Sequence, residues 1–258
     1  MTLTYIMAAT LFGGLVSVLL AAGLSAPLLG LIVRHLVSLS TGVLLGTALL
    51  HVLPEAFESN VEPQALFLTL LGGLMFFFLL EKAELYRHGH HHEHDGHHHH
   101  HHFDAEQAGR GGWSVLVGDS IHNFCDGVLI AASFLADPHL GFVTSLAIIA
   151  HEIPQEVGDY IVLINAGFSR MRALVYNMIS GMAAVVGGVL GYFLIVPFQE
   201  YLPYMMVVAA SSFVYVAVAD LIPQLQKRLN GRDTVLQIFW LAVGLVMIAS
   251  IVHGIHEH

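Results

Sequence analysis

The sequence is poor in charged residues. Asp, Glu, Lys and Arg together make up 11% of its 258 residues, whereas a soluble domain carries roughly 25%. Apolar residues make up 56%, and the mean hydropathy is +0.72. This composition argues against a soluble domain and predicts an integral membrane protein, with the lipid bilayer as its surroundings.

Cysteine and basic residues are also scarce. The single cysteine, Cys125, excludes a disulfide within the chain and a zinc site built from several cysteines. The chain has nine Lys and Arg residues and 19 Asp and Glu residues, for a net charge of −10. This charge argues against nucleic acid as a partner. The first residues, 1–4, hold no basic side chain. We therefore expect no cleaved signal peptide, so that the first apolar segment directs insertion.

Long apolar segments follow one another along the chain. A helix needs about 20 residues to cross the hydrocarbon core of a bilayer, and eight segments reach that length. They cover residues 5–24, 35–56, 64–86, 113–135, 139–165, 170–196, 203–225 and 234–255. The sequence therefore predicts an all-α integral membrane protein with eight transmembrane helices.

The basic residues predict the orientation of these helices. All of them fall in or beside alternate connections, and so on one side of the membrane: Arg34, Lys82, Arg87, Arg110, Arg170, Arg172, Lys227, Arg228 and Arg232. By the positive-inside rule this side is the cytoplasm, and both termini are expected outside. We expect a multi-pass protein of the plasma membrane, the inner membrane in a bacterium.

Two proline turns predict an internal repeat. The segment from His51 to Glu55, which contains Pro54, resembles the segment from Asp220 to Gln224, which contains Pro223, at an offset of 169 residues. Because the two helices are expected to run in opposite directions, the repeat is inverted, as in many transporters. The alternative is a chance alignment of apolar sequence that contains glycine and proline.

The repeat predicts a 3+2+3 arrangement of the helices. This arrangement consists of a first three-helix repeat at 1–86, a cytoplasmic His-rich loop at 87–112, two central helices at 113–165 and a second three-helix repeat at 170–258.

The segment 87–112 is of low complexity and holds eleven of the nineteen histidines. Such a segment cannot form a packed core, so we expect it to be disordered. Neutral imidazole binds zinc, copper and nickel, which makes a cytoplasmic metal buffer the predicted role. The candidate ligands are His90, His91, His92, His94, His97 and His98.

Two polar runs lie inside the central apolar segments. They are His122-Asn123-Phe124-Cys125-Asp126-Gly127 and His151-Glu152-Ile153-Pro154-Gln155-Glu156. In the first, Asp119, His122 and Asp126 have the i, i+3, i+7 spacing that places them on one helix face. At ~1.5 Å per residue, both runs come close to the middle of a ~30 Å hydrocarbon core, from opposite sides.

These runs bring several carboxylates to a similar depth, with no Lys or Arg in either helix: Asp119, Asp126, Glu152, Glu156 and Asp159. A charged group at the centre of a spanning helix costs roughly 2.5–3.5 kcal/mol, so a cation is the expected partner. Imidazole, amide and carboxylate groups suit a borderline divalent ion such as Zn²⁺, Fe²⁺, Mn²⁺ or Co²⁺. A proton relay and a purely structural polar network are the alternatives.

The two motifs resemble those of the ZIP (Zrt/Irt-like) family of divalent-metal transporters, and the resemblance covers essentially the whole chain. It implies a two-metal or stepwise site that moves Zn²⁺ into the cytoplasm, with Fe²⁺, Mn²⁺, Cd²⁺ or Co²⁺ as further substrates. One metal position would be lined by His122, Asp126, His151 and Gln155, and a second by Asn123, Asp126 and Glu152. Glu156 is a further candidate ligand; it and Asp159 would otherwise orient ligands or lie on the exit path.

The chain departs from the related subgroup at position 155. That subgroup usually has histidine where this chain has Gln155, and often has aspartate where this chain has Thr47. An amide oxygen is a harder and weaker ligand than imidazole. We therefore expect either selectivity relaxed toward iron or manganese, or looser binding at this position.

Polar residues near the two proline turns are candidates for the mouths of a pathway. We expect an outer relay at His51 and Glu55 and an inner one at Asp220. Helix capping or anchoring at the membrane interface is the alternative for each.

We expect a transporter and not an enzyme, with the metal ion as its substrate, no organic cofactor, and a homodimer as a possible assembly. The alternative is an intramembrane zinc-dependent hydrolase. Against it, the sequence has no His-Glu-x-x-His motif, since Gln155 stands four residues after His151. A metal exporter with a cytoplasmic His loop fits less well, because its usual pattern has six helices.

Overall fold

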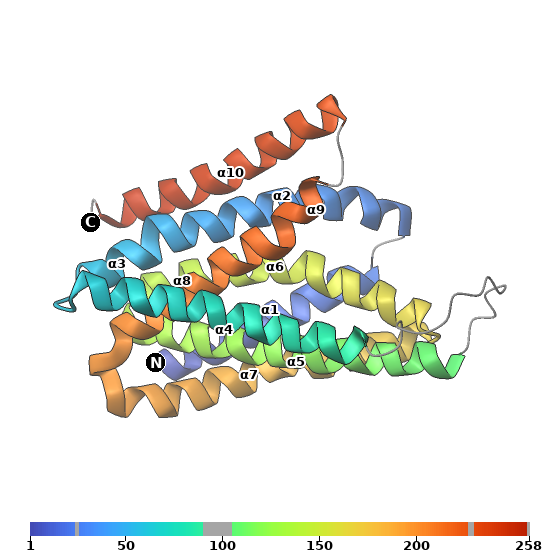
Figure 1. Cartoon of the computed structure of the whole chain (residues 1–258), viewed down its shortest axis with the longest axis horizontal. Helices are drawn as coiled ribbons and strands as arrows, with labels where there is room; N and C mark the ends of the chain where they lie inside the picture. The colour runs from blue at the N-terminus through green and yellow to red at the C-terminus, as the bar shows by residue number, and fades with distance from the viewer. Residues whose placement is uncertain (24–25, 90–104, 227–229, 257–258) are drawn as a thin grey trace.

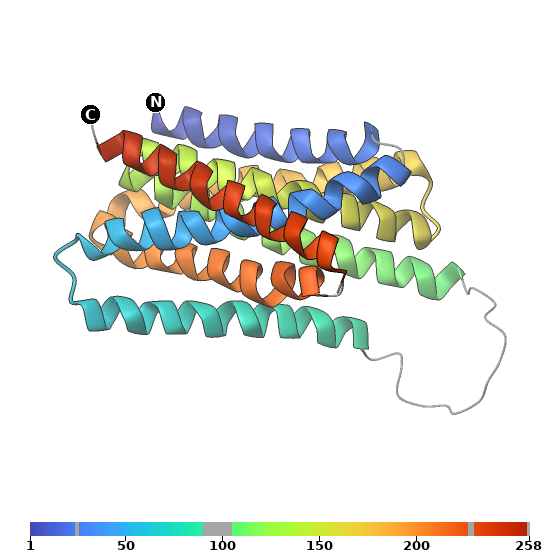
Figure 2. The same cartoon turned by 90° about the horizontal axis from the view of Figure 1, so that it is seen from above.

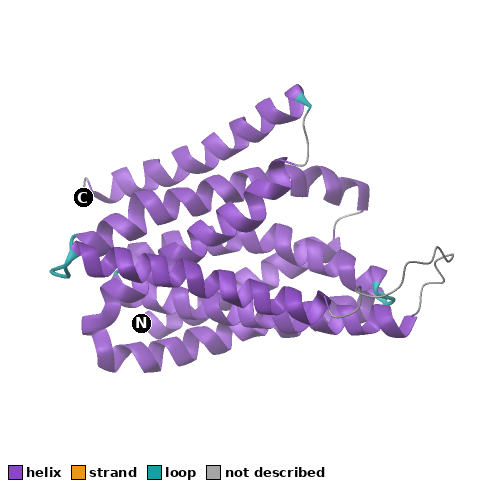
Figure 3. Cartoon of the chain, in the orientation of Figure 1, coloured by secondary structure: helices purple, strands orange, loops and turns teal. Residues whose placement is uncertain are grey.

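The computed structural model describes residues 1–23, 26–89, 105–226 and 230–256. In this part of the chain the secondary structure is helical throughout, with short connections and no strand (Figure 3). The predicted all-α class is therefore confirmed for the described residues. The N-terminus and the C-terminal end of the last helix lie at the same end of the molecule (Figure 1).

The helices follow the predicted apolar segments. In chain order they are α1 (Thr2–Gly23), α2 (Ala26–Thr47), η1 (Ala48–Val52), α3 (Leu53–Phe57), α4 (Pro63–Gly89), α5 (Ala105–Ala136), α6 (Pro138–Asn165), α7 (Arg170–Ile195), η2 (Val196–Tyr201), α8 (Leu202–Tyr215), η3 (Val216–Leu221), α9 (Ile222–Gln226) and α10 (Gly231–His256).

Six segments of the described residues are long and apolar enough to cross a membrane. They are Thr2–Leu20, His35–Phe57, Pro63–Lys82, Val115–Ala136, Arg170–Gln226 and Gly231–Gly254. The fifth contains 57 residues and extends from α7 to α9. The helix α6 is not among the six, since the polar run from His151 to Glu156 lowers the hydropathy of its second half. The chain thus has the character of an integral membrane α protein.

Local sequence explains why α5, α6 and α7 lie next to one another. Asp137 caps α6, because its Oδ1 accepts hydrogen bonds from the backbone N–H groups of His139 (2.7 Å) and Leu140 (3.1 Å). Pro138 then occupies the first turn, where no backbone donor is needed. At the other end of α6, Gly167 has a φ of +88°, which a glycine adopts without strain. Both connections reverse the chain within a few residues.

The helices α1, α5, α6 and α7 form a first group, in which each helix contacts the other three. The contact between α5 and α7 is especially close. Gly127 faces the backbone of Ala184, and Gly187 faces the backbone of Phe124, with no room for a Cβ at either glycine. Small residues at helix contacts let backbones approach in a bilayer, where the hydrophobic effect does not drive helices together.

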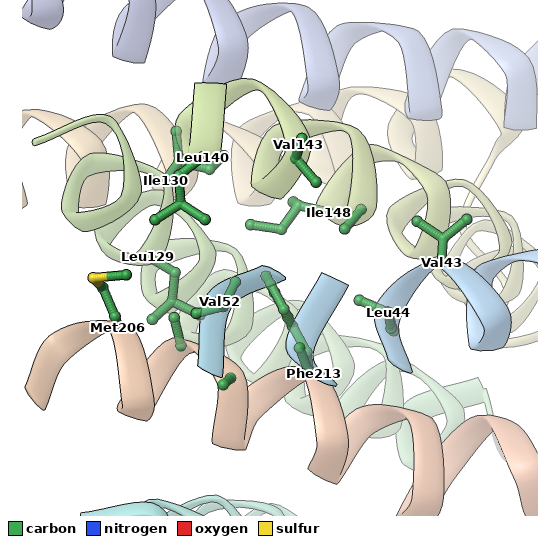
Figure 4. Packing of buried hydrophobic residues seen from close by; sticks show 14 of the residues in the cluster. Val43, Leu44, Val52, Leu129, Ile130, Leu140, Val143, Ile148, Met206 and Phe213 are labelled. Atoms are coloured by element: carbon green, nitrogen blue, oxygen red, sulfur yellow. The ribbon is translucent and has the colours of Figure 1, made fainter. Parts of the chain in front are cut away.

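The helices α2, α4, α8 and α10 form a second group, in which α2 packs along α10 and α8 along α4. The groups meet mainly where α2 lies along α6. The turned view of Figure 2 shows how the helices run beside one another. The apolar core fills the space between the two groups and includes residues of both (Figure 4): Val43, Leu44, Val52, Leu129, Ile148 and Phe213. The contact between the groups is therefore largely apolar.

Two π-helical segments precede two of the prolines. The segment η1 ends two residues before Pro54, and η3 ends two residues before Pro223. Local π-helical turns are frequent at functional positions. The two π-helical segments thus overlap the two proline-containing segments that the predicted repeat relates.

Candidate metal centre

Four side chains meet at the contact between α5 and α6: His122, Asp126, His151 and Glu152. Each offers one nitrogen or oxygen atom, and these four atoms all lie within 4.8 Å of one another. Of the described residues, no other group of three or more His, Cys, Asp or Glu side chains is as close. The two polar runs thus converge in the structure.

The distances among these atoms match the size of a tetrahedral metal site. The Nε2 atoms of His122 and His151 are 3.3 Å apart. The Nε2 of His151 lies 3.1 Å from Asp126 Oδ2 and 3.6 Å from Glu152 Oε1, and the Nε2 of His122 lies 3.7 Å from each of these oxygens. Two ligands at ~2.0–2.1 Å from a tetrahedral Zn²⁺ are about 3.3–3.4 Å apart. Small movements would therefore place all four atoms around one ion.

The four side chains differ in their access to solvent. The residues Asp126, His151 and Glu152 are 1–3% exposed, whereas the side chain of His122 is 24% exposed. Both carboxylate oxygens of Glu152 are buried and accept no hydrogen bond from the described residues. A buried carboxylate without a donor is costly unless it is neutralised or holds a cation. The buried part of the centre is therefore suited to a cation.

A backbone carbonyl orients the imidazole of His151. Its Nδ1 lies 3.2 Å from the carbonyl oxygen of Ala147, one turn earlier in α6. When Nδ1–H donates to this oxygen, the lone pair of Nε2 is directed at Asp126 and His122. Such a hydrogen bond on the remote nitrogen is the usual way to fix the tautomer of a metal-binding histidine.

Two amide side chains of the motifs donate hydrogen bonds to the carboxylate of Asp119. The Nδ2 of Asn123 donates to Asp119 Oδ1 at 2.9 Å, and the Nε2 of Gln155 donates to the same oxygen at 3.3 Å. The structure therefore brings Asn123, Gln155 and buried Asp119 together. It also places Glu152 beside both histidines, with its Oε1 3.7 Å from the Nε2 of His122 and 3.6 Å from that of His151.

Glu156 lies on the side of α6 that faces α7. It is fully buried, and its carboxylate oxygens accept no hydrogen bond from the described residues. A Cβ added at Gly181 of α7 would lie 3.6 Å from its Oε1. The Nδ2 of Asn177, also on α7, donates to the backbone oxygen of Glu156 at 3.0 Å. The sequence reasoning missed Asn177, although an amide in the middle of an apolar helix was a usable signal.

The remaining candidates lie away from the four ligand atoms. Asp159 is half-buried, one turn beyond Glu156. His51 is buried in η1, and Glu55 is half-buried in α3. The helix α3 lies at the end of the molecule that holds the termini (Figure 1). Asp220 is exposed in η3 and accepts a hydrogen bond of 2.9 Å from Gln224. The loop histidines lie outside the described residues: His90, His91, His92, His94, His97 and His98.

Comparison with known proteins identifies related sequences. A family model described as ZIP zinc transporter matches residues 81–252. The zinc transporter foi of Drosophila melanogaster is 34% identical over 148 residues, which cover 55% of this chain and 20% of that protein. The human zinc transporter ZIP10 is 40% identical over 113 residues, which cover 44% of this chain and 14% of that protein. The zinc transporter ZIP13 of Pongo abelii is 28% identical over 231 residues, which cover 83% of this chain and 65% of that protein. The chain thus spans a fifth or less of foi and ZIP10.

Proposed function

Because the chain belongs to the ZIP zinc transporter family, we propose that it moves Zn²⁺ across a membrane into the cytoplasm. The ion would be held by His122, Asp126, His151 and Glu152, with Fe²⁺, Mn²⁺, Cd²⁺ and Co²⁺ as further substrates. The relatives are named as zinc transporters, which favours Zn²⁺ as the main substrate. Inward direction rests on the family resemblance of the motifs.

One observation carries this proposal: each of two imidazole nitrogens lies 3.1–3.7 Å from the other and from the same two buried carboxylate oxygens. Mixed nitrogen and oxygen ligands suit Zn²⁺. The two carboxylates offset the charge of a divalent ion, and no Lys or Arg lies in the described parts of α5 and α6 other than Arg110, near the start of α5. The centre thus fits a divalent cation better than a structural polar network.

The next carboxylates along the pathway support a stepwise passage. Asp119 and Glu156 lie one helical turn from the four ligand atoms, on the cytoplasmic side in the proposed topology. A second metal position at Asn123, Asp126 and Glu152 would share two residues with the first, and it would require Asn123 to turn away from Asp119. We place Asp119 and Glu156 on the exit side, with Gln155 between them and the centre.

The proposed topology has eight crossings. It treats α6 as a crossing despite its polar run and lets the long segment Arg170–Gln226 cross twice. This puts both termini outside, in a plasma membrane, and relates the first and last three crossings as an inverted repeat. His51 and Glu55 would then lie near the outer mouth, and Asp220 near the inner one.

The number of ligands favours transport over hydrolysis. A catalytic zinc usually has three protein ligands and an open position for water. Here four side chains already converge, which leaves no such position in a tetrahedral site. The named relatives, all transporters, favour the same choice.

Purified protein in liposomes that contain a zinc-sensitive dye tests this function. Wild type should produce a dye signal when Zn²⁺ is added outside, and both His122→Ala and Asp126→Ala should lose most of it. Ser250→Ala is a matched control, since exposed Ser250 bonds only to the backbone of its own helix, at Val246. A wild-type protein that moves neither Zn²⁺, Fe²⁺ nor Mn²⁺ would contradict the proposal.

A further inference from the structure

Pro154 leaves one backbone group of α6 without its helical partner. Proline has no N–H, so the carbonyl oxygen four residues earlier, that of Ala150, cannot form the usual helical hydrogen bond. In a helix that crosses a membrane, such a carbonyl must find another donor, because there is no water in the hydrocarbon core. Ala150 directly precedes His151 and Glu152, so this break lies in the turn that carries half of the metal centre.

The missing donor comes from the other helix group. The hydroxyl of Ser40, in α2, donates to the carbonyl oxygen of Ala150. Ser40 is fully buried, and α2 lies along α6. A residue 110 positions away thus completes the hydrogen bonding of α6, across the largely apolar contact between the two groups.

We propose that Ser40 is a positioning residue for the metal ion. Its hydroxyl holds the α6 turn that presents His151 and Glu152, and so makes α2 a part of the metal centre without contributing a ligand. The inference rests on the proposed function, because it requires those two residues to bind metal. A second carbonyl that precedes Pro154 in α6, that of Ala147, orients the His151 ring. The backbone of this turn thus positions the ligands at two points.

The consequence for binding follows from the tolerance of a metal site. Protein ligands of Zn²⁺ keep their distances within about 0.2 Å. Without Ser40 the Ala150 carbonyl has no donor, and α6 would shift or twist near Pro154 to find one. Both ligands of α6 would move with it. Ser40→Ala should therefore weaken Zn²⁺ binding about three- to tenfold, the effect of losing one buried hydrogen bond.

A double-mutant cycle isolates this mechanism. Pro154→Ala restores a backbone N–H four residues after Ala150, so the carbonyl gains a partner inside its own helix. Ser40→Ala should then change Zn²⁺ affinity less than about twofold in the Pro154→Ala background, because the two replacements act on one carbonyl. Ser40→Thr, which keeps the hydroxyl, should retain wild-type affinity in the Pro154 background. If Ser40→Ala does not fold, Ser40→Cys takes its place in the cycle as a much weaker donor.

The measurement is Zn²⁺ affinity of the full chain in detergent, by competition with a chromophoric chelator, together with the absorption spectrum of bound Co²⁺. Ser145→Ala is the matched control: buried Ser145, also in α6, donates to Gly141 within its own helix, so its loss should change neither affinity nor spectrum. His151→Ala, which removes one ligand, shows the affinity and the spectrum that result when the metal centre is lost.

The outcomes separate the inference from the function on which it rests. Unchanged affinity in Ser40→Ala, or an equal loss in both Pro154 backgrounds, overturns the role of Ser40 while His151→Ala still abolishes binding. A wild-type chain that binds no Zn²⁺ overturns the proposed function and the inference together. Weaker binding in Ser40→Ala alone, with recovery in Ser40→Thr and in the Pro154→Ala background, supports the inference.

Discussion

The Nε2 atoms of His122 and His151 face each other at 3.3 Å across the contact between α5 and α6. Two neutral imidazoles whose lone pairs point at each other repel, unless a proton or a cation lies between them. Asp126 Oδ2 is 3.1 Å from one of these nitrogens and 3.7 Å from the other, so the same point also lies beside a carboxylate. Two imidazole nitrogens beside a shared carboxylate make the centre suitable for a cation, and the first predictions concern it.

Removing one charge from the centre should weaken metal binding while keeping its shape. Glu152→Gln replaces a carboxylate that has no hydrogen-bond donor among the described residues. We expect Zn²⁺ affinity to fall at least about tenfold, because a neutral amide is a poorer zinc ligand. Chelator competition measures this. Glu200→Gln, at an exposed position in η2, should leave the affinity unchanged, and an equal fall in both variants would contradict the assignment.

Position 155 should govern the choice of metal. The Gln155 side chain lies beside the centre and reaches Asp119, so an imidazole there would add a softer ligand next to the four atoms. We expect Gln155→His to shift uptake toward Zn²⁺ relative to Mn²⁺ and Fe²⁺. Competition between these ions in liposome uptake measures the shift. The same replacement at exposed Gln64, at the start of α4, should have no effect, and an unchanged ranking in Gln155→His would count against this role.

The close contact between α5 and α7 should not tolerate a methyl group. A Cβ at Gly127 would collide with the backbone of Ala184, and backbone atoms cannot move aside as a flexible side chain can. Gly127→Ala should therefore destabilise the protein by about 1–3 kcal/mol, as overpacking does elsewhere, and should lower its melting temperature in detergent.

The control for that prediction is Gly72→Ala in α4. A Cβ at Gly72 meets nothing within 4 Å, and alanine favours a helix by about 1 kcal/mol over glycine. This variant should melt at the wild-type temperature or above. Equal melting temperatures for Gly127→Ala and wild type would show that the two helices are less closely packed than the structure indicates.

The proposed topology predicts which connections a membrane-impermeant thiol reagent can reach. In a Cys125→Ser background, Glu58→Cys and Glu200→Cys should be labelled on intact cells, because both connections are expected outside. Asn230→Cys should be labelled only after the membrane is opened. All three positions are exposed in the structure, so burial would not explain a difference. Labelling of Asn230→Cys on intact cells would contradict eight crossings with outside termini.

The sequence predicted the parts of the molecule that depend on local pattern. Apolar length predicted an all-α membrane protein, and the spacing of His122 and Asp126 predicted their common face. The polar runs from His122 and His151 were expected to meet from their depths alone, and the structure brings them together. These predictions succeed because helical periodicity is regular and because ionisable groups are costly in apolar helices.

Contacts that depend on how the helices pack could not be predicted from the sequence. The carbonyl freed by Pro154 could be predicted, but its donor, Ser40, is decided by the contact of α2 with α6. The position of Gln155 beside Asp119 likewise depends on the rotation of α6 against α5. The role of Asn177 follows from the approach of α7, which places its amide on the backbone of Glu156.

The most direct test of the central claim is X-ray absorption at the zinc edge of the purified protein loaded with one equivalent of Zn²⁺. We expect a four-coordinate ion with two imidazole nitrogens and two carboxylate oxygens, all at about 2.0–2.2 Å. In His151→Ala, one imidazole contribution should disappear from the spectrum. A zinc shell without histidine, or one unchanged by His151→Ala, would contradict the claim that these four residues hold the ion.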